Sequence, residues 1–175
     1  MKKKINKKFG IVFWITGLSG AGKTTLAKKI YPFIQKNYGP TVIISGNELR
    51  KILSLDGFTK NERFEIGKKY NEFCNHIIKN KVNVIISVVG LFHDLHRVNK
   101  ITLKNYVEIF IKAKIETLRK KKKKFFYRKK ANNVWGIDLI PEFPKKPDIT
   151  ITNDFKKNVN QLKEDLIKKI YKKLK

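Results

Sequence analysis

The chain has 175 residues, with 41 lysines and arginines against 14 aspartates and glutamates, so its formal net charge is +27. The length fits one domain with its own core, and a single cysteine, Cys74, excludes an internal disulfide framework. No apolar run approaches the roughly 20 residues of a spanning helix, and residues 1–8 do not lead into the apolar segment of a signal peptide. We therefore expect a cytoplasmic protein with no membrane partner.

The positive charge has three explanations: a nucleic-acid partner, a site for polyanionic nucleotides, or lysines on solvated surfaces. Lysines are spread along the whole chain and greatly outnumber arginines. Aromatic residues are not interleaved with them, as an RNA-stacking surface requires. We therefore favour solvated lysines, with a small contribution from a substrate site and without a nucleic-acid partner.

Apolar periodicity and turn residues predict strands alternating with helices. In chain order the predicted elements are strand 10–16, helix 23–37, strand 41–45, helix 48–53, helix 59–80, strand 82–89, helix 94–103, strand 106–111, helix 115–121, strand 149–152 and helix 158–174. Pro32 is expected to bend or break its helix, Asp94 to cap its helix, and Cys74 to be a core thiol. Strand 82–89 is apolar on both faces, which is typical of a central parallel strand.

The stretch GLSGAGKT at residues 17–24 follows the first predicted strand and opens the first helix. It fits the pattern G-x-x-x-x-G-K-[ST], whose backbone amides and helix N-terminus hold nucleotide phosphates. Lys23 is expected to act at the β- and γ-phosphates, and the Thr24 hydroxyl to ligate Mg²⁺. The predicted ATP-binding residues of this loop are Gly17, Leu18, Ser19, Gly20, Ala21, Gly22, Lys23, Thr24 and Thr25.

Together these features predict an α/β protein with the P-loop kinase fold, a three-layer sandwich around a mostly parallel sheet. A flexible basic arm, residues 1–8, would precede a single domain of residues 9–175. Residues 120–130 carry eight cations, too many to bury, and should form part of a mobile basic lid over about 120–138. Ligands of such sheets bind beyond the carboxyl ends of the strands. The loops that meet this rule are 17–24, 45–50 and 90–93.

The run GLSGAGKTTLA at residues 17–27 resembles the signature of the adenylylsulfate (APS) kinase family, and the resemblance extends over about residues 9–154. This family uses ATP to phosphorylate the 3′-hydroxyl of a nucleotide whose 5′-phosphate carries a sulfate. The resemblance implies that Arg50, Phe58 and Arg63 hold the acceptor nucleotide. Phe58 would stack on the base, or else anchor its loop in the core, and the arginines would bind the phosphate end. It also implies a possible homodimer.

The sequence departs from the family mainly on the acceptor side. The family's Asp-Gly-Asp is replaced by Ser45-Gly46-Asn47, an asparagine of the following helix is replaced by Ile66, and Ser-Pro-Tyr-Arg is replaced by residues 90–93, GLFH. An intact ATP loop beside an altered acceptor side resembles the cytidine diphosphoramidate kinase branch of the family, found among capsule-modification enzymes. A true adenylylsulfate kinase and a basic nucleic-acid-binding P-loop ATPase remain the alternatives.

The remaining predictions assign single residues to the reaction. Asn47 is expected to orient the attacking 3′-hydroxyl, although it cannot take the proton. Phe92 and His93 are expected at the acceptor, with an ordinary loop histidine as the alternative for His93. Lys121 and Lys124 are expected to close over ATP. Of the nearby carboxylates, Glu48 is equally explained as a residue of the first helical turn, so no general base is assigned.

Overall fold

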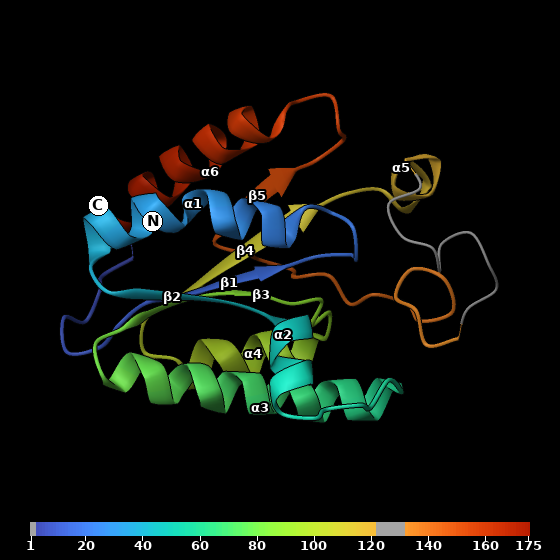
Figure 1. The fold of residues 1–175 in the computed structure, drawn as a ribbon, viewed down its shortest axis with the longest axis horizontal. Helices are drawn as coiled ribbons and strands as arrows, with labels where there is room; N and C mark the ends of the chain where they lie inside the picture. The colour runs from blue at the N-terminus through green and yellow to red at the C-terminus, as the bar shows by residue number, and fades with distance from the viewer. Residues whose placement is uncertain (1–2, 122–131) are drawn as a thin grey trace.

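The computed structural model describes residues 3–121 and 132–175 (Figure 1). Its sheet has five strands in the order β2-β3-β1-β4-β5, and every neighbouring pair is parallel. The strands are β1 (Val12–Thr16), β2 (Thr41–Ser45), β3 (Asn83–Ser87), β4 (Tyr106–Lys112) and β5 (Ile149–Thr152). The five predicted strands are thus confirmed, and β3, predicted as a central parallel strand, lies between β2 and β1 with all its residues buried.

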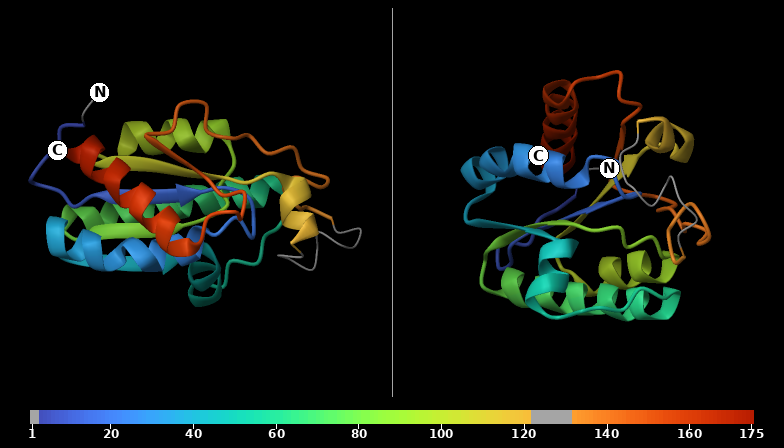
Figure 2. Two further views of the ribbon diagram at one scale, coloured as in Figure 1. Left: turned by 90° about the horizontal axis from the view of Figure 1, so that it is seen from above. Right: turned by 45° about the vertical axis from the view of Figure 1, so that its right-hand side comes forward.

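The helices cover both faces of this sheet. They are α1 (Lys23–Tyr38), α2 (Gly46–Ile52), α3 (Lys60–Lys79), α4 (His93–Thr102), α5 (Ile115–Lys120) and α6 (Val159–Leu174). Figures 1 and 2 show α1 and α6 on one side and α3 and α4 on the other. The predicted three-layer α/β sandwich is confirmed.

The core is divided by the sheet because successive strand side chains point to opposite faces. In β1, Trp14 packs with the α3–α4 side, whereas Phe13 and Ile15 pack with α1 and α6. All three side chains are fully buried. Cys74 of α3 lies in the first of these clusters, and burial raises the pKa of its thiol to about 12. The prediction of a core thiol is therefore confirmed.

Two local predictions about helices need correction: Pro32 does not break its helix, and Asp94 does not cap one. Helix α1 runs through Pro32 without a break. Pro32 and Lys28, whose carbonyl would otherwise accept from residue 32, are both exposed, so water can satisfy that carbonyl. Asp94 does not cap α4: the N-cap is Phe92, no side chain caps the helix, and Asp94 instead pairs with Arg97 at 3.0 Å.

The N-terminal residues, expected to form a flexible arm, are bound to the domain from Lys3 onward. The Lys3 amide donates to the carbonyl of Lys173 at 2.8 Å, and its ammonium lies 3.0 Å from Asp148. The Asn6 amide donates to Asn105 at 2.9 Å. These contacts hold the described part of this segment beside the last turn of α6 (Figure 1).

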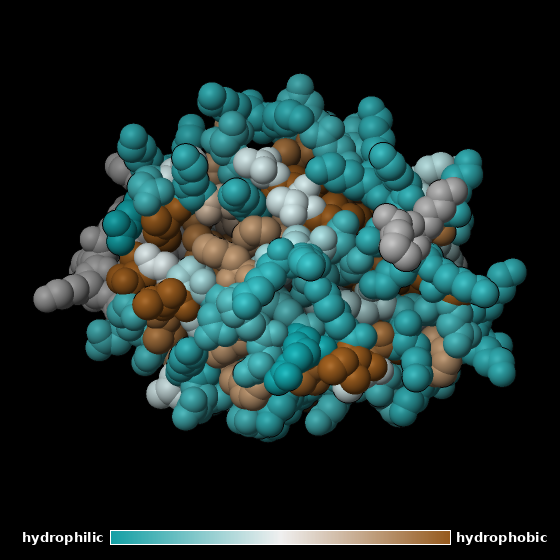
Figure 3. Space-filling view, turned by 180° about the vertical axis from the view of Figure 1, so that it is seen from behind, coloured by the Kyte–Doolittle hydropathy of each residue, from teal (hydrophilic) through white to brown (hydrophobic). Residues whose placement is uncertain are grey.

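The surface is described by the hydropathy of its residues. Viewed from behind, the surface is mostly hydrophilic, and hydrophobic side chains occupy separate areas of it (Figure 3). None of the helices in the described residues has the length and apolar character needed to cross a bilayer.

Candidate active site

The phosphate loop joins β1 to α1 at the carboxyl edge of the sheet. Two of its glycines are required by the backbone: a Cβ on Gly17 would lie 2.4 Å from the Ile111 carbonyl oxygen, and Gly22, the N-cap of α1, has a φ of 98°. No side chain caps this end of α1, and its first turn carries no acidic residue. The positive end of the helix dipole is therefore left for an anion.

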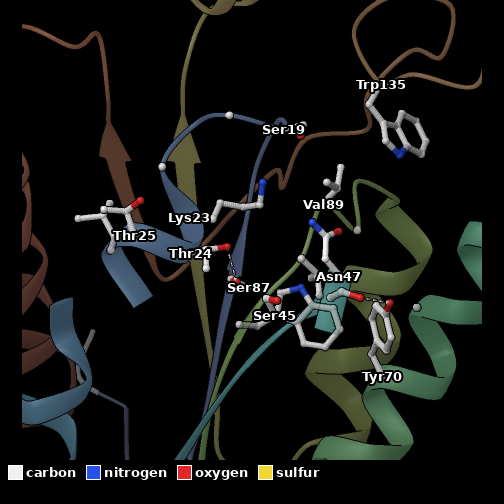
Figure 4. A pocket seen from close by; sticks show the side chains of 18 of the residues that line it. Ser19, Lys23, Thr24, Thr25, Ser45, Asn47, Tyr70, Ser87, Val89 and Trp135 are labelled. Atoms are coloured by element: carbon white, nitrogen blue, oxygen red, sulfur yellow. Dashed lines mark hydrogen bonds between the residues drawn. The ribbon is translucent and has the colours of Figure 1, made fainter. Parts of the chain in front are cut away.

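Lys23 and Thr24 stand at the start of α1 and face the cavity above the loop (Figure 4). The Lys23 ammonium donates to the Leu18 carbonyl at 2.9 Å, which holds the side chain folded over the loop. The Thr24 hydroxyl lies 3.0 Å from the Ser87 hydroxyl at the end of β3. Both side chains are thus held by partners at the cavity side of the loop.

Two supporting residues were missed by the sequence analysis. Ser87 partners Thr24, and Asn153, which follows β5, donates from its amide to the Ala21 carbonyl of the phosphate loop at 2.9 Å. Each is a polar residue at the carboxyl end of an apolar strand, and that position is the signal that would have found it.

A cavity of about 770 Å³ opens beside the phosphate loop, within the range of small-molecule sites. Its walls come from α1, the start of α2, α3, the loop after β3, residues 132–135 and residues 153–157. Trp135 forms part of the cavity wall (Figure 4). The three loops predicted to meet at this edge all reach the cavity.

Asn47 lies on the cavity wall, exposed, at the second residue of α2. Next to it, Glu48 closes a capping box: its carboxylate accepts from the Ser45 amide at 2.8 Å, while the Ser45 hydroxyl accepts from the Glu48 amide at 3.2 Å. These bonds to Ser45 lower the pKa of Glu48. Glu48 does not line the cavity, so its position is that of a helix cap rather than a base.

Arg50, Phe58 and Arg63 are brought together by the structure, and all three line the cavity. The two guanidinium carbons lie 4.8 Å and 5.3 Å from the centre of the Phe58 ring. Phe58 is 53% exposed, so it is not a core anchor. Arg63 also donates to the carbonyls of Phe58 and Asn133. Burial and the nearby charge of Arg50 lower the pKa of Arg63, so an anion between the two arginines would be favoured.

The side chains of Phe92 and His93 lie in different surroundings. Phe92 is 4% exposed and makes edge-to-face contacts with Phe64 and Trp135, so it forms a buried part of the cavity wall. His93 lies outside the cavity, because its amide donates to Glu142 and its ring nitrogen Nε2 lies 3.0 Å from the carbonyl oxygen of Phe143. The expectation that His93 reaches the acceptor is therefore not supported by this arrangement.

Of the predicted lid residues, Lys121 is exposed at the end of α5 and does not line the cavity, and Lys124 lies outside the described residues. The chain returns at residues 132–138, where Asp138 accepts from the amides of Asn133 and Val134. This turn carries Trp135 into the cavity wall.

The cavity is cationic. Among the described residues its charged lining consists of Lys23, Arg50, Arg63 and Lys157, with no aspartate or glutamate. The undescribed residues 1–2 and 122–131 contain no acidic residue in the sequence. A cavity of this charge, built on a phosphate loop, suits two phosphate-bearing ligands that exchange a phosphoryl group.

The fold and this site define a P-loop phosphotransferase. Comparison with known proteins narrows the class, because residues 9–152 match the adenylylsulphate kinase family model. The chain therefore belongs to the adenylylsulfate kinase family and is a nucleotide 3′-kinase with an alcohol group as acceptor. Kinases of this family use ATP.

Individual relatives differ in the acceptor that they are named for. The chain is 31% identical, over 91% of its length and 95% of the relative's, to the cytidine diphosphoramidate kinase of Campylobacter jejuni subsp. jejuni serotype O:2. It is 32% identical to the adenylyl-sulfate kinase of Clostridium acetobutylicum, over 86% of this chain and 78% of the relative. The Mycobacterium tuberculosis APS kinase solved with AMPPNP and APS shares the fold, with a TM-score of 0.82 and 20% identity over 93% of this chain and 98% of the other.

Proposed function

We propose that this enzyme phosphorylates the 3′-hydroxyl of cytidine 5′-diphosphoramidate, giving the 3′-phosphorylated nucleotide and ADP. The observation that carries the proposal is an intact phosphate loop beside an acceptor wall that departs from the adenylylsulfate pattern at Asn47, Ile66 and Gly90. All three residues line the cavity, and Ile66 puts a buried apolar group where the family has an amide. The similarity to the Campylobacter kinase supports the same acceptor. Such a product would serve phosphoramidate modification of capsular sugars.

The ATP phosphates would be held by the amides of residues 17–24 and by the Lys23 ammonium. The paired hydroxyls of Thr24 and Ser87 fit a Mg²⁺ ion held by one or two protein oxygens, the phosphates and water. When bound, that ion neutralises charge on the phosphates. Arg50 and Arg63 would hold the diphosphoramidate end of the acceptor, and the exposed Phe58 ring would stack on its base.

In the reaction, the acceptor 3′-oxygen forms a bond to the γ-phosphorus while the bond between that phosphorus and the bridging oxygen of ATP breaks, and ADP leaves. Asn47 would orient the hydroxyl by a hydrogen bond. No aspartate or glutamate among the described residues lines the cavity, and residues 1–2 and 122–131 contain none, so the hydroxyl proton would pass to a transferred phosphoryl oxygen or to water. A loose transition state tolerates this, since the proton is lost late and positioning carries most of the catalysis.

The test is ADP release with ATP, Mg²⁺ and either cytidine diphosphoramidate or adenylylsulfate, with Lys23→Ala as the inactive control. Turnover with the cytidine compound and a much lower kcat/KM with adenylylsulfate is the expected result. A preference for adenylylsulfate would overturn the proposed acceptor. Adenylylsulfate is the second candidate acceptor because curated relatives at 25–32% identity are named adenylyl-sulfate kinases. If neither compound is turned over, both acceptor assignments are overturned.

A further inference from the structure

Tyr70 stands in the middle of α3 and reaches across to the start of α2. Its side chain is buried, 5% exposed, and its hydroxyl donates to the Gly46 carbonyl at 2.9 Å. Figure 4 shows Tyr70 pointing at the segment that carries Asn47. A residue of α3, 24 positions further along the chain, thus holds the backbone immediately before the proposed hydroxyl-orienting residue.

Gly46 is packed closely against Val88 and Tyr70. A Cβ added there would lie 3.1 Å from Val88 Cγ1, which is tighter than an ordinary contact, and 3.5 Å from Tyr70 Cε2, which is an ordinary van der Waals contact. The Gly46 carbonyl and the Asn47 amide belong to one planar peptide unit. Fixing that carbonyl therefore fixes the plane from which the Asn47 side chain departs.

Asn47 depends on this backbone for its direction. Its side-chain amide makes no hydrogen bond within the described residues, and the residue is exposed on the cavity wall. A side chain without such a partner is aimed by its own backbone and rotamer. The peptide held by Tyr70 therefore determines where the Asn47 amide can meet an acceptor hydroxyl.

The environment of Tyr70 suits a permanent donor. Burial raises the pKa of its hydroxyl, and the nearby charge of Arg50 only partly opposes this rise. The hydroxyl therefore keeps its proton at neutral pH and can donate to the Gly46 carbonyl.

We propose that Tyr70 is a positioning residue for phosphoryl transfer, acting through the Gly46 carbonyl on Asn47. The inference rests on the proposed 3′-kinase reaction and adds a determinant of its rate. Catalysis of this kind is sensitive to position, since a displacement of about 1 Å can cost roughly 100-fold. Tyr70→Phe removes one hydrogen bond and keeps the ring, so it should displace Asn47 by less than about 1 Å. We therefore expect kcat to fall about tenfold.

The test compares Tyr70→Phe with Tyr106→Phe, a matched variant that also loses one buried hydroxyl. The Tyr106 hydroxyl donates to Glu108 at 3.0 Å in β4 and does not line the cavity. For Tyr70→Phe we expect a lower kcat with the acceptor and an unchanged KM for ATP. For Tyr106→Phe we expect a lower melting temperature and an unchanged kcat. Equal kcat for Tyr70→Phe and the wild type would overturn the inference.

A second variant pair separates positioning from simple structural support. Asn47→Ala should lower kcat, and adding Tyr70→Phe to it should produce no further loss, because the residue that Tyr70 positions is then gone. Additive losses would show that Tyr70 does not act through Asn47 and would overturn the inference. An inactive wild-type enzyme would overturn the proposed function and this role together, whereas an active wild type with an unaffected Tyr70→Phe overturns this role alone.

Discussion

Asn153 ties the phosphate loop to the end of β5, and its replacement by alanine gives the sharpest test of the structure. Its side-chain amide donates to the Ala21 carbonyl at 2.9 Å, and its side-chain oxygen accepts from the Phe155 amide at 3.1 Å. The residue is 5% exposed, and its own amide donates to the Lys112 carbonyl at 2.8 Å. Asn153→Ala keeps the backbone bond and removes both side-chain bonds.

The expected cost follows from these two bonds. Removing the partner of the buried Ala21 carbonyl costs on the order of 1–3 kcal/mol, so we take about 2 kcal/mol for this substitution. In a domain of this size each kcal/mol lowers the melting temperature by roughly 2–4 °C, which gives roughly 4–8 °C. The released Ala21 carbonyl also loosens the loop that holds the ATP phosphates, so the KM for ATP should rise several-fold.

The assay pairs thermal unfolding with ATP-dependent kinetics. Asn158→Ala is the control: the Asn158 side chain caps α6 by accepting from the Gln161 amide at 3.0 Å, and Asn158 does not line the cavity. Its loss should cost about 1 kcal/mol and leave the KM for ATP unchanged. If Asn153→Ala changes the KM for ATP no more than Asn158→Ala does, the claim that Asn153 supports the phosphate loop is refuted.

Three further outcomes are expected. Arg63→Ala should raise the KM for the acceptor about tenfold or more with little effect on ATP, because the proposed function places the acceptor at Arg63, which donates to the Phe58 and Asn133 carbonyls. Equal effects on both substrates in steady-state kinetics would contradict this. Glu48→Gln should retain kcat, because the carboxylate caps α2 outside the cavity; a loss above 100-fold would identify Glu48 as a base. Burial alone would raise the pKa of Glu108, but His96 and Lys100 lower it overall from 4.5. Glu108 therefore stabilises the folded state above about pH 4.5, and this stabilisation is lost as the pH falls through the lowered pKa. Glu108→Gln should flatten this acid loss in urea titrations.

Local sequence patterns were enough to predict the phosphate loop and the order of strands and helices. The phosphate loop was predicted correctly because its glycines, lysine and threonine act within one strand–turn–helix unit, where spacing alone fixes geometry. The strand and helix order followed from apolar periodicity, and the Thr59 and Glu62 capping box marked the start of α3. These signals require only neighbours along the chain.

Only the tertiary structure decided which side chains share the cavity. Phe92 and His93 are adjacent in sequence, yet one forms the cavity wall and the other turns to residues 142–143, because the rotation of α4 is set by packing. The bond from Tyr70 to Gly46 spans 24 residues and that from Asn153 to Ala21 spans 132. Contacts between residues so far apart in the sequence depend on how the helices pack against the sheet, and no local pattern along the chain specifies that packing.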